Sequence, residues 1–559
     1  MNRPIATASL DDPLYYLKNF ETVVRWVREH HGDLLTSDER ALIDRLLDLP
    51  QPARALLVRL VMRSGERFRQ SKLNYPELGA PVDEALDVLA AAGWVEDDPE
   101  LDIEALFDAL TVAECRNALG TWLAESPLPR SASKKAMLAH CRELTPEPRR
   151  FSHWWPQTDD RLVALHHMAL FDRIRLMFFG NLRQSWPDFV LVELGHHRYE
   201  TVPFTPDSRA FQSRDDVDRY LAMQACRDRL EAGEPPAAIW PDIPPRNANP
   251  WLESRRGRLL MELGRQADRS GEVELALRAW GESGHREARL RQLRLLERLK
   301  RPEDAWAVAR DAVDDPRGDG EARGLERLLK RLARKLDQTP PLAPRRPPIP
   351  EQTLVLPKPE AMSVEWAALE HLSQERAPVC YVENTLINGL FGLLCWPALF
   401  APLPGAFFHP FHLAPADLHR EDFVQRRQAL FDDCLAALDG GNYKDRIRDN
   451  WRAKQGLSSA FVHWPVLTEP VLEMALACIP AAHLKLLFQR LLRDLREHRS
   501  GLPDLIRFVP YDATYEMIEV KGPGDRLQDH QIRWLEFCLE HGLPVSVCYV
   551  RWSEADECR

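Results

Sequence analysis

The sequence predicts a multi-domain protein whose N-terminal and middle domains are mainly α-helical and whose C-terminal domain is α/β. Its 559 residues exceed what one hydrophobic core usually organises, so we expect three or four domains. Apolar residues recur with helical spacing near the N-terminus, as at Leu42, Leu46 and Leu47. Residues 501–550 instead follow the order strand, turn, strand, loop, helix, strand, which is typical of a compact α/β unit.

The composition excludes several classes of protein. Hydrophobic residues make up 45% of the chain and charged residues 28%, which are ordinary globular values. The ten cysteines never form a C-x-x-C pair, so we expect reduced thiols and neither zinc knuckles nor iron–sulfur clusters. The N-terminus lacks the apolar segment of a secretory signal, and the apolar stretch Leu386–Phe400 is interrupted by Asn388 and Pro397. We therefore expect a cytoplasmic protein without membrane contact.

Two proline-rich stretches mark candidate domain boundaries. Six prolines lie between Pro235 and Pro250, and eight between Pro340 and Pro359; such runs favour extended linkers. The predicted domains are residues 1–105 (N-terminal helical domain), 106–160 (helix-pair module), 161–250 (connecting helical and mixed region), 251–340 (helical repeats), 341–360 (proline-rich linker) and 361–559 (α/β domain).

The segment 110–144 predicts two short amphipathic helices, the second capped by Ser131 or Ser133. Between 110 and 150, seven Lys/Arg outnumber four Glu, a local charge of +3 in a chain whose formal net charge is −11. For nucleic-acid binding, the local charge matters more than the total. The helix pair resembles a SAP module, a small DNA-binding motif, which implies that Lys134 and Lys135 contact DNA. A helical hairpin with a solvated basic rim is the alternative.

Residues 251–338 predict a second helical region. The string GEVELALRAW (271–280) is echoed by RPEDAWAVAR (301–310), with Ala276 and Ala305 at equivalent places. This region resembles degenerate tetratricopeptide (TPR-like) repeats, whose helix pairs stack into scaffolds or docking surfaces. A plain helical bundle is the alternative, because the period is irregular.

The candidate catalytic residues lie in the C-terminal α/β block. In a strand at 515–521, Glu519 and Lys521 share one face. Asp504 opens the preceding strand, so a hairpin would bring the two carboxylates together. Phosphodiester hydrolysis uses hard oxygen ligands for Mg²⁺ or Mn²⁺, and Asp504, Glu519 and the Val520 carbonyl would supply them. Lys521 would orient or deprotonate the attacking water and stabilise charge beside the metal.

The PD at 503–504, followed by EVK at 519–521, resembles the signature of PD-(D/E)xK nucleases, and the strings GLPDL and IEVKGPGDRLQDHQ resemble the VRR-NUC branch. The resemblance implies a restriction-endonuclease-like fold and a metal-dependent DNA nuclease. It also implies that Gln531, on the next helix, lies near the metal, whereas the alternative is a solvated helix residue. A surface hairpin with a Glu/Lys pair would not explain why both motifs occur together.

The same resemblance implies a further acidic ligand upstream of the PD motif, and the segment VENTLINGLFGLLCWPALF (382–400) offers Glu383. A carboxylate that enters a buried helix needs a partner, which a metal ion would supply. A favourable interaction with the helix dipole is the alternative.

Basic residues precede the PD turn. Between 484 and 499, five Lys/Arg outnumber two acidic residues, a local charge of +3. Arginines fork onto phosphate without reading base sequence. The resemblance implies a basic pocket for a terminal 5′ phosphate, for which Arg496, Arg499 and Arg526 are the candidates; a solvated helix face is the alternative.

The order of SAP-like module, helical repeats, ENTLINGLFGLLCW segment and PD…EVK motif resembles the Fanconi anaemia-associated nuclease family over about residues 110–555. The resemblance implies structure-specific cleavage of branched DNA with a preference for 5′ flaps, accompanying 5′-to-3′ exonuclease activity and a role in interstrand-crosslink repair. We further expect two Mn²⁺ or Mg²⁺ ions per site, branched or flapped duplex DNA as the partner, a nucleoid-associated location and a repair protein docked on the repeats.

Two other functions stay open at this stage. Stand-alone VRR-NUC domains can be Holliday-junction resolvases, which would act as a homodimer. A non-catalytic helical-repeat scaffold in DNA repair is the alternative of another class, and the intact set of Asp504, Glu519 and Lys521 argues against it.

Overall fold

The computed structural model describes residues 12–124, 128–129, 131–144, 147–190, 198–339, 348–358 and 362–553. The chain divides into two compact units: Met1–His196 with Phe211–Val217, and His197–Ala210 with Asp218–Arg559. Arg130 of the predicted basic helix pair and residues 341–347, 359 and 360 of the predicted linker lie outside the described residues.

The first unit is mainly helical, as the sequence predicts, but its described residues also form five short strands. Its helices are α1 (Tyr15–His30), α2 (Ser37–Asp48), α3 (Gln51–Val61), α4 (Val82–Ala91), α5 (Ile103–Ala109), α6 (Val112–Ala118), α7 (Gly120–Ala124), α8 (Lys134–Glu143), α9 (Phe151–Trp154), α10 (Met168–Phe179) and α11 (Trp186–Val190). The strands β1 (Arg67–Arg69), β5 (Leu162–Leu165) and β2 (Val95–Asp97) form an antiparallel sheet, and β3 (Glu100–Leu101) pairs with β4 (Arg149–Arg150). Strands of two to four residues are too short to show a two-residue period, so the sequence pattern missed them.

The basic helix pair predicted at 110–144 forms helices α6 to α8. Ser133, and not Ser131, caps α8 by accepting a hydrogen bond from the Ala136 amide at 3.2 Å. The apolar side chains buried in this module include Cys115, Leu119, Met137 and Cys141. Lys134 and Lys135 form the first turn of α8, where neither side chain makes an ion pair with a described residue.

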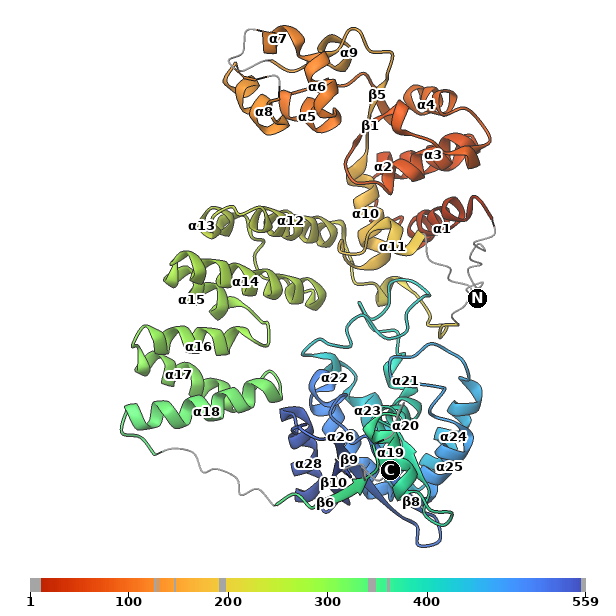
Figure 1. Cartoon of the computed structure of the whole chain (residues 1–559), viewed down its shortest axis with the longest axis vertical. Coiled ribbons are helices and arrows are strands. Elements are labelled where there is room, and N and C mark those ends of the chain that lie inside the picture. Colours follow the sequence, from red (N-terminus) through yellow and green to blue (C-terminus); the bar gives the residue numbers. More distant parts are fainter. Residues whose placement is uncertain are drawn as a thin grey trace, which may run out of the picture. The chain divides into compact units, whose positions relative to one another are not determined.

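The middle of the second unit is a stack of helical hairpins (Figure 1). Its helices are α12 (Arg214–Glu231), which begins in the first unit, α13 (Pro236–Ile239), α14 (Pro250–Ser270), α15 (Val273–Glu282), α16 (Ala288–Arg298), α17 (Pro302–Val313) and α18 (Asp319–Lys335). Ala276 in α15 and Ala305 in α17, at equivalent places in the predicted repeat, are both fully buried. The stretch from Pro235 to Pro250 is not an extended linker. It contains α13 and begins α14, because proline is well suited to a first helical turn.

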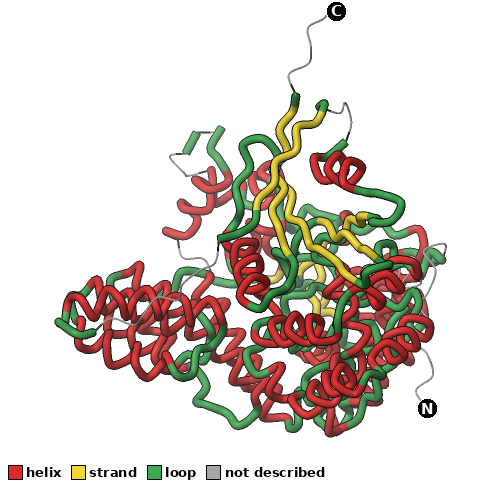
Figure 2. Tube along the Cα trace, turned by 90° about the horizontal axis from the view of Figure 1, so that it is seen from below, coloured by secondary structure: helices red, strands yellow, loops and turns green. Residues whose placement is uncertain are grey.

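The C-terminal part of the second unit is built on a five-stranded mixed sheet (Figure 2). The strand order is β6 (Glu351–Leu356), β10 (Val545–Trp552), β9 (Thr514–Lys521), β8 (Leu505–Val509) and β7 (Val379–Tyr381). β10 runs parallel to both of its neighbours, whereas β9, β8 and β7 are antiparallel in turn. Residues 351–356, which were predicted to be part of a proline-rich linker, form strand β6 instead. This strand was missed because its short apolar run lies between Pro350 and Pro357.

Helices cover both faces of this sheet. They are α19 (Val364–Leu372), α20 (Leu386–Leu394), α21 (Trp396–Leu399), α22 (Phe423–Arg426), α23 (Gln428–Gly440), α24 (Tyr443–Ala453), α25 (Glu469–Cys478), α26 (Ala481–Arg493), α27 (Leu495–His498) and α28 (Asp529–Glu540). On one face, Ala368 of α19 shares a core with Ile518 and Val520. The other face contributes Ile506 and Met517 to a larger core with α20, α26 and α28. The apolar helix α20 is buried along its whole length, as the sequence predicts.

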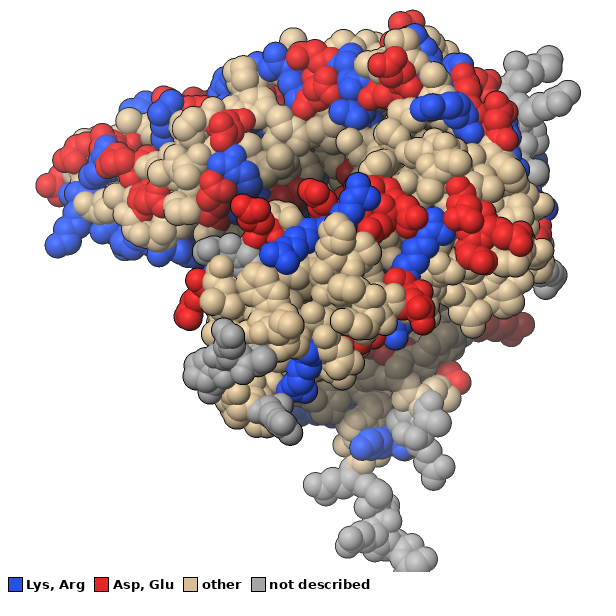
Figure 3. Space-filling view, turned by 90° about the horizontal axis from the view of Figure 1, so that it is seen from above, with Lys and Arg blue, Asp and Glu red and all other residues tan. Residues whose placement is uncertain are grey.

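The hydropathy of the helices and the charge of one face of the surface bear on what the protein can contact. Among the described residues, no single helix is long and apolar enough to cross a membrane, and α25 and α26 meet that measure only together, as a pair bent by 108°. On the face drawn in Figure 3, basic and acidic side chains are interspersed. That face therefore shows no large field of a single sign.

Gly264 provides a test of the repeat packing. It lies against Trp280 of α15, where an added Cβ would meet the indole Nε1 at 2.5 Å. Gly264→Ala is expected to push the helices apart and lower the unfolding free energy by about 1–3 kcal/mol, measured as a lower melting temperature by calorimetry. Gly320→Ala is the matched control, because α18 leaves open space there and alanine suits a helix. Equal melting temperatures for the two variants would contradict this packing.

Candidate active site

The hairpin of β8 and β9 brings the two predicted carboxylates together. Asp504 immediately precedes β8, and Glu519 lies near the end of β9, next to Ile518, which pairs with Leu505. The Asp504 Oδ2 accepts a hydrogen bond from the Val520 amide at 2.8 Å. Both carboxylates are buried, with exposed fractions of 7% for Asp504 and 0% for Glu519.

Two side chains donate to the same oxygen of Glu519. The Lys521 Nζ and the Gln531 Nε2 each lie 2.6 Å from the Glu519 Oε1. Gln531 is held at the first turn of α28, because its own Oε1 accepts a hydrogen bond from the Gln528 amide at 2.9 Å. The structure therefore gathers Asp504, Glu519, the Val520 backbone, Lys521 and Gln531 into one cluster.

The loop before Asp504 is fixed by residues that the sequence analysis did not assign to the site. Gly501 has φ +86°, and a Cβ there would lie 2.9 Å from the His530 backbone, so only glycine allows the loop to pass α28 so closely. The Asn384 Oδ1 accepts a hydrogen bond from the Leu502 amide at 3.1 Å. Asn388 donates to the Asn384 carbonyl at 2.6 Å. In the sequence, the only sign of this role is that Asn384 and Asn388 stand in an otherwise apolar segment.

Glu383 is placed differently from the prediction. It does not enter a buried helix: it is exposed and lies before α20, which begins at Leu386. The Tyr381 hydroxyl donates to its Oε2 at 2.5 Å, so its carboxylate already has a partner. It is nevertheless near the cluster, because its charge contributes to raising the pKa values of Asp504 and Glu519.

Burial dominates the electrostatics of the cluster. It raises the pKa of Asp504 to about 6, against the opposing hydrogen bond from Val520 and the charge of Lys521. Burial and the neighbouring Asp504 charge raise the pKa of Glu519 to about 7, again opposed by Lys521. One ammonium therefore does not balance the two carboxylates, and an added cation would favour their ionised forms.

The residues fit a divalent cation, although the described residues contain no group of three or more His, Cys, Asp or Glu side chains arranged to hold one. The Glu519 Oε2 is buried and has no hydrogen-bond partner among the described residues, which is a costly arrangement unless a ligand binds there. Two carboxylates and a backbone carbonyl are hard oxygen donors of the kind that Mg²⁺ and Mn²⁺ prefer.

The three arginines proposed for phosphate do not converge. Arg496 lines a cleft of about 530 Å³ between the start of α18 and the residues around α22, α26 and α27. Arg499 and Arg526 are not among its lining residues. The Arg499 guanidinium is already engaged, because it donates to the Ala460 carbonyl and lies over the Phe461 ring at 4.4 Å. Arg526 is exposed on the loop after β9.

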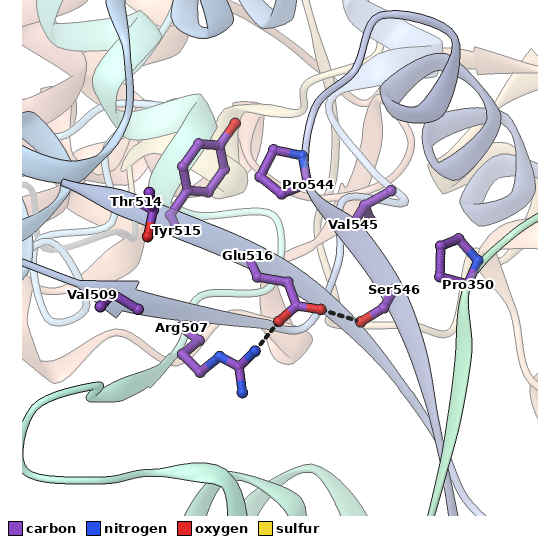
Figure 4. Close-up of a pocket in the computed structure, with 9 residues that line it drawn as sticks. All are labelled: Pro350, Arg507, Val509, Thr514, Tyr515, Glu516, Pro544, Val545 and Ser546. Atoms are coloured by element: carbon purple, nitrogen blue, oxygen red, sulfur yellow. Dashed lines mark hydrogen bonds and ion pairs between the residues drawn. The ribbon is translucent and has the colours of Figure 1, made fainter. Parts of the chain in front are cut away.

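A second pocket, of about 420 Å³, is lined by Thr514, Tyr515 and Glu516 at the start of β9 (Figure 4). Glu519 and Lys521 lie at the other end of this strand. In the pocket, Glu516 is paired with Arg507 and accepts a hydrogen bond from the Ser546 hydroxyl at 2.7 Å. Its polar groups are thus satisfied within the pocket, which makes Glu516 a control position for the buried carboxylates.

The raised pKa values predict how stability depends on pH without metal. The folded protein binds protons at Glu519 more tightly than the unfolded chain, so this stabilisation is complete at low pH and is lost between 4.5 and about 7. In EDTA at pH 8, Glu519→Gln should therefore raise the unfolding free energy by about 2–3 kcal/mol. Calorimetry should show a higher melting temperature for the variant at pH 8 and no gain near pH 4.5.

Glu516→Gln serves as the control and should give no such gain. Mn²⁺ should raise the melting temperature of the unaltered protein and not that of Glu519→Gln, because ligands that bind the native state stabilise it. A Glu519→Gln protein that melts earlier than the unaltered one in EDTA at pH 8 would contradict this electrostatic account.

Comparison with known proteins gives three family matches. The VRR-NUC domain matches residues 439–552, the Fanconi anemia-associated nuclease SAP domain matches 100–154, and the FAN1 HTH domain matches 14–96. The last covers a region in which no motif was recognised, since the apolar spacing of a helix-turn-helix resembles that of any small helical domain.

Whole-chain comparisons agree. A Fanconi-associated nuclease 1 homolog of Pseudomonas aeruginosa is 48% identical over 555 residues, covering 99% of this chain and 98% of its own. An Arabidopsis thaliana homolog is 26% identical, covering 96% and 67%. The crystal structure of paFAN1 bound to 2nt 5′flap DNA with gap matches with a TM-score of 0.80 and 48% identity, over 98% of this chain and 100% of that one. The chain belongs to the Fanconi-associated nuclease 1 family and is a DNA nuclease.

Proposed function

We propose that this nuclease hydrolyses phosphodiester bonds in branched DNA, preferring 5′ flaps, and that Mn²⁺ or Mg²⁺ bound at Asp504 and Glu519 supports the reaction. The observation that carries the proposal is the buried Oε2 of Glu519, which has no hydrogen-bond partner in the described part of the chain and lies beside a second buried carboxylate. The related paFAN1 structures, which contain 5′ flap DNA, support the choice of substrate.

Each residue of the cluster has a role that follows from its position. Asp504, Glu519 and the Val520 carbonyl would hold the cation. A divalent cation in such a site lowers the pKa of water and offsets charge on the phosphate. The Lys521 ammonium, which donates to Glu519, would orient the attacking water and stabilise negative charge. Gln531 donates to the Glu519 Oε1 and would thereby fix the orientation of the carboxylate.

The cleft lined by Arg496 is a better candidate site for a terminal 5′ phosphate than a pocket formed by Arg496, Arg499 and Arg526 together. Its lining includes Arg286 and Arg420, but their charges are offset by Asp494 at 2.5 Å and by Asp422 at 2.6 Å. The cleft is also lined by Arg493 and Arg496, and by the acidic residues Asp315, Asp319 and Glu421. The charge of Arg493 acts on Asp319, whose pKa it helps to lower, so Arg496 is the candidate for a phosphate contact.

Cleavage assays test the function directly. The protein should cut labelled 5′-flap DNA in Mn²⁺ or Mg²⁺. It should cut 3′-flap, four-way-junction and plain duplex DNA more slowly, and it should cut no DNA in EDTA. Asp504→Asn should reduce the rate by at least about 10³-fold, because several kcal/mol of metal-derived stabilisation are lost. Glu516→Gln, on the same sheet but in the other pocket, should keep full activity. Metal-independent cutting, or an active Asp504→Asn protein, would refute the proposed site.

A second assay tests the cleft. Arg496→Gln should raise KM about tenfold for a flap with a 5′ phosphate, which is the scale of one lost charge-assisted contact, and should leave a 5′-hydroxyl substrate unaffected. Arg452→Gln, an exposed arginine outside the cleft lining, is the control. An equal loss on both substrates would show that Arg496 does not read the terminal phosphate.

A further inference from the structure

Two aromatic side chains, Trp366 and Tyr381, stack on each other at the edge of the sheet formed by β7. Trp366, in the first turn of α19, is 49% exposed. Its ring stacks on Tyr381 of β7, with centroids 6.1 Å apart and ring planes at 24°. An indole half in water retains apolar surface that a flat ligand would cover favourably.

Tyr381 connects this pair to the catalytic acids. Its hydroxyl donates to Glu383, and burial, together with that hydrogen bond, raises its pKa, so the phenol stays protonated. In the sheet Tyr381 pairs with Leu505, the residue after Asp504. The next amide, Val382 N, donates to the Asp504 carbonyl at 2.9 Å. Tyr381 is thus on β7, the strand next to β8, which Asp504 immediately precedes.

Helix α19 holds Trp366 firmly at this place. Ala368 is fully buried in the core shared with the sheet. At the start of the helix, Val364 meets Gly522, the residue after Lys521: a Cβ on Gly522 would lie 3.6 Å from a Val364 methyl group. The first turn of α19 therefore contacts the residue that follows the catalytic strand β9, from the face of the sheet that carries Ile518 and Val520.

The negative charge around Trp366 and Tyr381 favours an uncharged ligand over an anionic one. Glu383 and Glu365 both contribute to raising the pKa of Asp504, so this edge of the sheet is rich in carboxylates. A phosphate or an acidic peptide is repelled here unless a cation binds. An uncharged aromatic ring pays no such penalty and gains stacking contacts. In a DNA nuclease such a ring is a nucleobase, and an unpaired base is the one free to leave its stack.

We propose that Trp366 and Tyr381 form a stacking site for one unpaired nucleobase beside the scissile phosphate. The strand is held at the cleavage point by its base, while its phosphate faces Asp504 and Glu519. Every base has a π face, so the contact tolerates any sequence, as an enzyme that selects DNA by shape requires. This inference rests on the proposed cleavage of branched DNA and adds a substrate-binding site to it.

Kinetics on modified 5′-flap DNA test the site. Trp366→Ala should lower kcat/KM about 10- to 100-fold, and Trp366→Phe, which keeps a ring, should recover most of it. An abasic nucleotide at one of the two positions flanking the scissile phosphate should cost the unaltered protein a similar factor and cost Trp366→Ala nothing further. Tyr511→Ala is the matched control, because this tyrosine is 96% exposed but lies in the β8–β9 turn, and it should behave as the unaltered protein.

A binding experiment in EDTA separates this inference from cleavage. With 2-aminopurine at the same nucleotide, binding by the unaltered protein and by Trp366→Phe should change the fluorescence of the base, and binding by Trp366→Ala should not. A protein that cuts no DNA would refute the proposed function, yet this readout would still decide the stacking site. The stacking site would be overturned if Trp366→Ala gave the same fluorescence change as the unaltered protein. It would also be overturned if the loss in kcat/KM from Trp366→Ala and the loss from the abasic nucleotide multiplied when the two were combined.

Discussion

The main constraint on the catalytic domain is that two carboxylates, Asp504 and Glu519, are buried with a single ammonium, that of Lys521. Asp504 and Glu519 are almost fully excluded from solvent, and Lys521 and Gln531 satisfy only one oxygen of Glu519. Such burial of charge is unfavourable by itself. A bound cation would offset that cost, because it favours the ionised forms of both carboxylates.

The surrounding fold keeps these groups in place from several directions. The antiparallel ladder of β8 and β9 sets the two carboxylates opposite each other. Gly501 lets the loop before β8 pass against α28, and Asn384 holds the same loop from the start of α20. Because elements distant in sequence meet at this loop, the catalytic geometry is determined by tertiary packing and not by the PD and EVK motifs alone.

The site and the fold could be predicted from the sequence to different extents. The two-residue period of a strand was enough to place Glu519 and Lys521 on one face, and the motif spacing was enough to pair them with Asp504. The short strand β6 and the engagement of Arg499 were not predictable, since each depends on contacts between residues far apart in the chain. The exposure of Glu383 was not predicted because α20 begins three residues later than expected, at Leu386. A count of basic residues likewise could not show that Arg490 packs against Trp534 and Phe537.

The central claim is that the free oxygen of Glu519 and the Asp504 carboxylate bind a divalent cation. Crystals of the protein soaked in Mn²⁺ and measured at the manganese absorption edge would test it most directly. We expect an anomalous peak in contact with the Glu519 Oε2 and the Asp504 carboxylate, and no such peak in Glu519→Gln. A fully soaked crystal with no manganese at these two residues, or with manganese bound only at Glu365 or Glu383, would contradict the account.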